Sequence, residues 1–156
     1  MAGLLKLRIY IDTSVIGGCL DEEFRNDSGR LFDQFVSGKK IPVISDILLL
    51  ELEGAPTEAR DILKRVPVRN IEYVSLSEDS IALAGRYIED GAVAENSISD
   101  ARHIAIATVE RVDVLVSWNF RHIVNINRIR LLNSVNLKMG YPTLDIRSPK
   151  EVIYEE

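Results

Sequence analysis

The sequence has a single cysteine, no long apolar run and no segment that repeats at a regular interval. Because one thiol cannot close an intrachain disulfide, Cys19 excludes a fold held by disulfide bonds. Charged residues interrupt every apolar stretch before it reaches the ~18 residues that a membrane-spanning helix requires. The first residues also lack the apolar core of a signal peptide. We therefore predict a cytoplasmic protein that makes no contact with membranes.

Glycine and proline are scarce, with 9 and 5 residues in a chain of 156, and low-complexity tracts are absent. This composition excludes fibrous and disordered chains, and the absence of repeats excludes solenoids and propellers. A chain of this length fits one domain and can bury a sufficient core without metal or disulfide bonds. We expect one domain over residues 1–147 and a C-terminal tail over residues 148–156, of which residues 151–156 pack loosely or are mobile.

Positive charge is also in short supply, because the formal net charge is −5 at pH 7. A net negative charge counts against a protein that coats nucleic acid without specificity. Residues 119–144 are an exception, since they contain no carboxylate and their basic side chains are Arg121, Arg128, Arg130 and Lys138, with His122 beside Arg121. This segment has two interpretations, either a solvated helix face that is basic by composition or a surface for an anionic ligand.

Short runs rich in β-branched and aromatic residues alternate with stretches of helical periodicity. The runs predict strands at residues 7–11, 41–44, 71–74, 114–116 and 144–146. Apolar spacing, N-cap residues and glycines predict helices at residues 24–37, 46–53, 77–90, 97–110 and 125–137, with a further helix that starts near Thr57. Strands that alternate with helices pair in parallel through right-handed crossovers. The predicted class is therefore α/β, a three-layer α/β/α sandwich with a central parallel sheet of four or five strands.

Polar side chains with oxygen atoms follow the predicted strands, at the edge of the sheet where open α/β folds bind their ligands. These residues are Asp12, Thr13 and Ser14 after the first strand, Ser45 and Asp46 after the second, and Ser117 and Asn119 after the fourth. Asp100 belongs to the first turn of a predicted helix, where the helix dipole favours a carboxylate. We expect these separate segments to bring oxygen ligands to one edge of the sheet.

Each acidic residue also has a structural explanation. Asp12 is a preferred N-cap residue for a helix after the first strand. Ser97 and Asp100 have the spacing of a capping box, in which the acid bonds the backbone of the cap residue. Glu51 fits a solvated helix face, and His103 and Trp118 are residue types that more often pack than react. Taken one at a time, these residues leave structural and catalytic roles open.

Taken together, four segments resemble the PIN domain, and within it the VapC-type ribonucleases of bacterial and archaeal toxin–antitoxin pairs. The segments are residues 9–16 (IYIDTSVI), Ser45 with Glu51 six residues later, residues 100–107 (DARHIAIA) and residues 114–120 (VLVSWNF). Their order and spacing extend the resemblance from Leu7 to Ile146. Each segment is weakly specific alone, whereas four in the expected order favour a PIN-like fold.

The resemblance implies a catalytic cluster that binds a divalent metal. Its implied members are Asp12, Glu51, Asp100 and Asn119. Asn119 stands where such proteins usually carry a fourth acid, and it can bind a metal through its amide oxygen but brings no negative charge. Neighbouring polar and basic residues are the expected substrate contacts, namely Ser14, Ser117, Arg121 and His122.

Clustered carboxylates suit Mg²⁺ or Mn²⁺, which prefer oxygen ligands in octahedral geometry. Such an ion orients water for attack on a phosphodiester and neutralises the charge that builds on the phosphate. The resemblance implies products with a 5′-phosphate and a 3′-hydroxyl. Because water is then the nucleophile, a preference for RNA has to come from binding. We predict a metal-dependent endoribonuclease, the toxin of a toxin–antitoxin pair, with RNA and a small antitoxin as partners and a homodimer by analogy.

One competing function is excluded and another stays open. A haloacid-dehalogenase-type phosphatase needs an acid two residues after its nucleophilic aspartate, and Ser14 occupies that position after Asp12. The open alternative is a catalytically weak or inactive PIN-fold module that binds RNA or protein. Asn119, which replaces an acid, is the observation in its favour.

Overall fold

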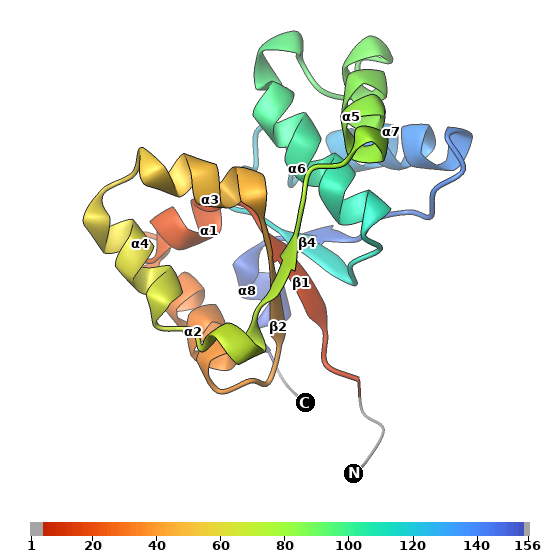
Figure 1. Ribbon diagram of the computed structural model, residues 1–156. Helices are drawn as coiled ribbons and strands as arrows, with labels where there is room; N and C mark the ends of the chain where they lie inside the picture. Colours follow the sequence, from red (N-terminus) through yellow and green to blue (C-terminus); the bar gives the residue numbers. More distant parts are fainter. Residues whose placement is uncertain (1–4, 155–156) are drawn as a thin grey trace.

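A computed structural model describes residues 5–154, which fold around a five-stranded parallel sheet (Figure 1). The strands are β1 (Arg8–Ile11), β2 (Ile41–Ser45), β3 (Glu72–Val74), β4 (Val114–Val116) and β5 (Ile146–Arg147). Neighbouring strands pair in parallel in the order β3-β2-β1-β4-β5. Because the strand order reverses between β1 and β4, the carboxyl ends of these two strands form the switch point at which open α/β sheets bind ligands.

Helices cover both faces of the sheet (Figure 1). One face carries α1 (Thr13–Gly18), α2 (Arg25–Val36), α3 (Asp46–Glu53), α4 (Thr57–Lys64) and α8 (Pro149–Val152). The opposite face carries α5 (Glu78–Glu89), α6 (Ile98–Val109) and α7 (Ile126–Lys138). Short 3-10 turns at Val68–Asn70 and Glu95–Ser97 precede β3 and α6. The predicted three-layer sandwich with a parallel sheet is confirmed.

Strand β1 shows how the sequence builds two cores. Its side chains alternate between the faces of the sheet, as they do in any strand. Ile9 and Ile11 pack under α1 to α4, whereas Tyr10 packs under α5 to α7. All three residues are 0% exposed. A continuous apolar run is therefore what a central parallel strand requires, because both of its faces are buried.

The helix ends follow local signals in the sequence. Ser45 caps α3, since its hydroxyl accepts a hydrogen bond from the Leu48 amide at 3.2 Å. Gly38 and Gly91, which follow α2 and α5, have φ angles of 78° and 77° that favour glycine. Among the described residues, no helix is long and apolar enough to span a bilayer.

The C-terminal segment differs from the predicted loose tail. Ser148 and Glu151 form a capping box that begins α8, and α8 packs against α2. Ile153 is 1% exposed within the core under α1 to α4, and its carbonyl accepts a hydrogen bond from Gln34 at 2.9 Å. The prediction of loose packing is therefore wrong for residues 151–153, because the Ile153 side chain reaches the core. Tyr154 is 65% exposed. Residues 155–156 of the predicted tail and the first four residues of the predicted domain lie outside the described residues.

Candidate active site

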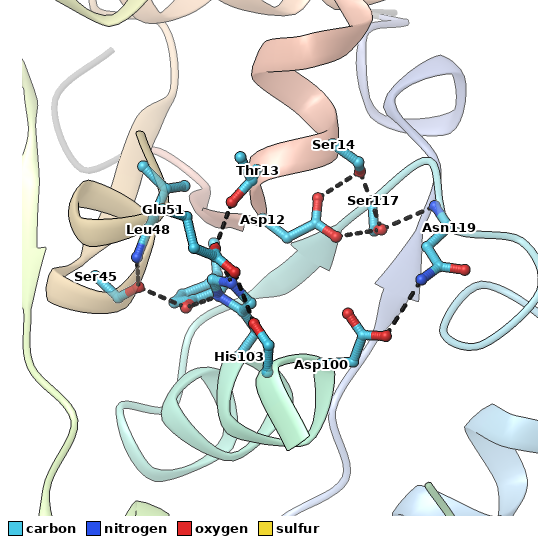
Figure 2. Close-up of polar contacts among 12 residues, drawn as sticks. Asp12, Thr13, Ser14, Ser45, Leu48, Glu51, Asp100, His103, Ser117 and Asn119 are labelled. Carbon is cyan, nitrogen blue, oxygen red and sulfur yellow. Dashed lines mark hydrogen bonds and ion pairs between the residues drawn. The ribbon is translucent and has the colours of Figure 1, made fainter. Parts of the chain in front are cut away.

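Asp12 lies at the switch point, directly after β1, and only 5% of the residue is exposed. Ser117, directly after β4, donates a hydrogen bond to its Oδ2 at 2.6 Å, and Ser14 donates one to its Oδ1 at 2.5 Å (Figure 2). The backbone amide of Trp118 in turn donates to the Ser14 hydroxyl at 2.9 Å. Two strand ends thus hold one carboxylate in a fixed orientation, and the predicted substrate contact Ser117 is itself fully buried behind Asp12.

The helix-capping roles that the sequence allowed for Asp12 and for the pair Ser97 and Asp100 are not found in the structure. Asp12 occupies the N-cap position of α1, but its side chain makes no capping hydrogen bond. Ser97 occupies the N-cap position of α6, and its side chain makes no capping hydrogen bond either. The local spacing that allowed these roles is therefore not used for capping.

Asp100, in the first turn of α6, shares an anionic environment with Asp12. Burial raises the pKa of Asp100, and the negative charge of Asp12 raises it further. Burial also raises the pKa of Asp12, against the hydrogen bonds from Ser117 and Ser14. At both carboxylates, a proton or a nearby cation would offset the cost of the negative charge.

Asn119 presents a donor to Asp100 and not an acceptor. Its Oδ1 accepts a hydrogen bond from the His122 amide at 3.0 Å, and this bond determines which way the side-chain amide faces. Its Nδ2 lies 3.4 Å from Asp100 Oδ2, which is a long and weak hydrogen bond (Figure 2). In this orientation Asn119 satisfies the acid that a metal would otherwise bind.

Glu51 extends from α3 into a set of three hydrogen-bond donors (Figure 2). It accepts from Thr13 Oγ1 at 2.5 Å, from Ser99 Oγ at 2.6 Å and from His103 Nε2 at 2.8 Å. Burial pushes the pKa of Glu51 up, but the hydrogen bonds from His103, Ser99 and Thr13 together outweigh it and lower the pKa to about 2. The carboxylate is therefore ionised at neutral pH.

His103 connects Glu51 to a buried tyrosine. The residue is 2% exposed, and its Nδ1 lies 2.6 Å from the hydroxyl of Tyr10, which also lies 2.8 Å from Ser45 Oγ. Burial raises the pKa of Tyr10, so its phenol stays neutral. From the sequence, His103 was interpreted as a residue type that more often packs than reacts, and Tyr10 was not identified as part of the site. The available signal was the spacing of His103, three residues after Asp100 on the same side of a helix.

A hollow of about 140 Å³ opens among these side chains. Its lining residues are Asp12, Thr13, Ser14, Glu51, Asp100, His103 and Asn119. The four residues predicted to be catalytic thus meet at one place, although they come from the end of β1, from α3, from α6 and from the loop after β4. Arg121 and His122 follow on that loop without lining the hollow; Arg121 is exposed and His122 is half-buried.

The donor set fits a hydrated metal ion better than a closed protein cage. Within residues 5–154, no three Asp, Glu, His or Cys side chains stand close enough together to enclose an ion by themselves. Mg²⁺, however, is commonly bound through one or two carboxylates while it keeps several waters. A divalent cation would also offset the repulsion that raises the Asp100 pKa. Asp12 and Asp100 therefore fit Mg²⁺ or Mn²⁺.

Solved structures match this chain by fold. A toxin–antitoxin complex from Klebsiella pneumoniae aligns with a TM-score of 0.57 and 16% identity, over 77% of this chain and 93% of its own. VapC20 of Mycobacterium tuberculosis, a sarcin-ricin loop cleaving toxin, aligns with a TM-score of 0.57 and 15% identity, over 73% and 92%. VapBC2 of Rickettsia felis, bound to a DNA fragment from its promoter, aligns with a TM-score of 0.57 and 14% identity, over 91% and 98%.

The chain has a VapC-type PIN fold. The fold expected from the four sequence segments is thereby confirmed, at identities that establish the fold alone. No protein-family model matches the sequence, and no curated protein matches it. In this PIN fold the hollow lies where the ends of β1 and β4 meet the start of α6.

Proposed function

We propose that this protein is a divalent-metal-dependent endoribonuclease and the toxin of a toxin–antitoxin pair. One observation carries the proposal. Asp12 and Asp100 line the same hollow, where burial and then the charge of Asp12 raise the pKa of Asp100. Two carboxylates that repel each other at the switch point of a PIN fold suit a divalent ion that binds a phosphodiester.

The side chains around the hollow have separable roles in this proposal. Asp12 and Asp100 bind the ion, and the hydroxyls of Ser14 and Ser117 keep the Asp12 carboxylate oriented. A bound Mg²⁺ or Mn²⁺ supplies an activated water and neutralises charge on the phosphate. Glu51, with a pKa of about 2, keeps its charge and can accept a hydrogen bond from a water molecule in the hollow.

RNA is the proposed substrate. Arg121 and His122 follow Asn119, and residues 119–144 contain no carboxylate, so positive charge is available beside the acidic hollow. Such charge attracts the phosphates of a nucleic acid. Attack by water does not need the 2′-hydroxyl, so discrimination against DNA arises in binding.

Incubating single-stranded RNA with the protein tests the activity. We expect cleavage with Mg²⁺ or Mn²⁺, none with EDTA, and products that carry a 5′-phosphate. Glu51→Gln should lower the cleavage rate by roughly 10- to 100-fold, the usual loss for a residue that supports a metal site. Glu53→Gln, an exposed acid on the same helix, is the matched control and should leave the rate unchanged. RNA that remains intact in both metals would contradict the proposal.

A small antitoxin is the proposed partner, and a homodimer is proposed by analogy. Two of the structures that share the fold are toxin–antitoxin assemblies. An adjacent short reading frame, co-expressed with this chain, should co-purify with it and inhibit cleavage. A frame whose product neither binds nor inhibits would remove the toxin assignment while leaving the nuclease assignment intact.

A second candidate function is a PIN-fold module that binds RNA or protein with weak or no cleavage. The orientation of Asn119 favours it, because the side-chain amide donates to Asp100 instead of adding a ligand oxygen. This candidate predicts that RNA binds equally well with EDTA and with Mn²⁺. The nuclease predicts tighter binding with the metal.

A further inference from the structure

Three aromatic side chains from the start of α2 and from the loop after β4 pack together, and we call them the aromatic platform: Phe24, Trp118 and Phe120. The rings of Phe24 and Trp118 stack with their centroids 4.1 Å apart, and the Phe120 ring meets Trp118 at 64° with centroids 6.0 Å apart. Phe120 is 49% exposed. The Phe120 ring thus packs on Trp118 while about half of the residue stays exposed to solvent.

Trp118, at the centre of the platform, is fixed from several directions. Its Nε1 donates a hydrogen bond to Ser28 Oγ at 2.8 Å, and its backbone amide donates to Ser14 Oγ at 2.9 Å. A methyl group at Gly18 would lie 2.5 Å from Nε1, so the close approach of α1 depends on that glycine. The platform is therefore organised before any ligand binds, which reduces the entropy that binding costs.

The platform is connected to the hollow through the chain and through one hydrogen-bonded serine. Asn119, which lines the hollow, lies between Trp118 and Phe120 in the chain. Ser14 bonds both the Asp12 carboxylate and the Trp118 amide. Trp118 is thus joined through one serine to a carboxylate of the hollow, and the exposed Phe120 ring packs on Trp118.

Charge distinguishes the two ends of the platform. The Phe24 end follows three exposed acidic residues, which are Asp21, Glu22 and Glu23. The Phe120 end is followed by Arg121 and by a segment without carboxylates up to residue 144. A polyanion is therefore repelled at the first end and attracted at the second.

We propose that Phe120, supported by Trp118, is a stacking site for one unpaired nucleobase of single-stranded RNA, adjacent to the nucleotide whose phosphate lies at the hollow. The inference rests on the proposed nuclease function. A ligand at this place needs a flat apolar face next to an anionic group, and an unpaired nucleotide has both. A duplex hides its base faces, so it fits poorly. Every base can stack on an aromatic ring. The site therefore distinguishes single strands from duplexes and does not select a base sequence.

The intrinsic fluorescence of the protein reports on this site directly, because Trp118 is the only tryptophan in the chain. Single-stranded RNA of about 10 nucleotides, within the ~4–16 that such sites cover, is titrated in Ca²⁺ while Trp118 emission and RNA anisotropy are followed. We expect the RNA to change the emission as it binds. Inorganic polyphosphate, which has charge but no bases, and an RNA duplex should leave the emission unchanged.

Substitutions at Phe120 distinguish base stacking from non-specific binding of RNA. Phe120→Leu should weaken binding of the single strand by roughly 5- to 100-fold, which corresponds to the loss of one stacked base. Phe120→Tyr should bind the single strand as tightly as the wild type, since it keeps the ring. Tyr73→Leu, which removes a ring that is 51% exposed on edge strand β3, is the matched control and should bind like the wild type.

The outcomes also distinguish this inference from the nuclease proposal. If Phe120→Leu cuts and binds single-stranded RNA as the wild type does, the stacking site is wrong and the nuclease stands. If Phe120→Leu dissociates a dimer or an antitoxin complex without changing RNA affinity, the platform is a protein interface and the stacking site is wrong. If RNA is bound through Phe120 but stays intact in Mg²⁺ and Mn²⁺, the stacking site stands and the nuclease proposal fails.

Discussion

Asp12 is a buried carboxylate whose pKa lies above its ordinary value, because burial outweighs the hydrogen bonds from Ser117 and Ser14. An acid with a raised folded pKa stabilises the fold when it is protonated, and this contribution is lost as the pH rises through the raised value. Asp100 has a shift of the same sign. The metal-free protein should therefore lose stability as the pH rises through this range, and bound Mg²⁺ should restore it.

Asp12→Asn tests both the chemistry and this electrostatic argument. Cleavage should fall on the order of 10²-fold or more, since residues that only support a metal site already cost up to that much. The metal-free variant should be as stable as the wild type or slightly more so above the raised pKa, because a buried charge has been removed. Thermal melting in EDTA between about pH 4 and 8 measures the second effect across the range where carboxylate linkage acts.

Two results would overturn this interpretation of Asp12. Cleavage at the wild-type rate would remove Asp12 from the metal site. A large loss of melting temperature in EDTA would instead mean that the carboxylate contributes a structural bond such as a cap.

Asn119→Asp tests the position at which an amide replaces the acid of an all-acidic cluster. The new carboxylate cannot donate to Asp100, so it adds a negative charge where the amide now offers a donor. Divalent ions bind more tightly as the charge of their ligands increases. We expect tighter Mn²⁺ binding and faster cleavage, followed in one titration of both proteins. If neither the wild type nor the variant cleaves RNA, the result favours the binding module.

Helix α8 is the element that the sequence described least well. Its one turn rests on a capping box and on Ile153, which is buried in the core under α1 to α4. Ile153→Ala should cost about 2–5 kcal/mol of unfolding free energy. Lys150→Ala, at an exposed position in the same helix, should change stability little. Chemical denaturation of both variants decides the matter, and equal midpoints would show that the segment does not contribute to the core.

Other elements followed from local patterns to within a few residues. The apolar run at β1 and the periodicity of α2 predicted elements that the structure contains at Arg8–Ile11 and Arg25–Val36. The last strand occupies Ile146–Arg147 in place of the predicted residues 144–146, because pairing with β4 sets its position. Strand bounds depend on a neighbouring chain segment, whereas helix periodicity lies within the segment itself.

At the scale of the whole molecule, the proposed assembly is a homodimer. Homodimerisation is expected by analogy with proteins that share the fold. Size-exclusion chromatography with light scattering should give twice the monomer mass of 17.5 kDa at tens of micromolar. A single species of monomer mass at that concentration would contradict the dimer.

The sequence by itself determined the alternation of strands and helices, the end of β1 just before Asp12 and the presence of acids in separate segments, because these features depend on neighbours along the chain. Only the tertiary structure decided how those acids are used. The contacts of His103 with Glu51 and Tyr10 join residues that are 52 and 93 positions apart. The donor that Asn119 presents to Asp100 likewise arises where the loop after β4 meets α6. Local propensity carries no information about such pairings, which exist only once the sheet has brought the segments together.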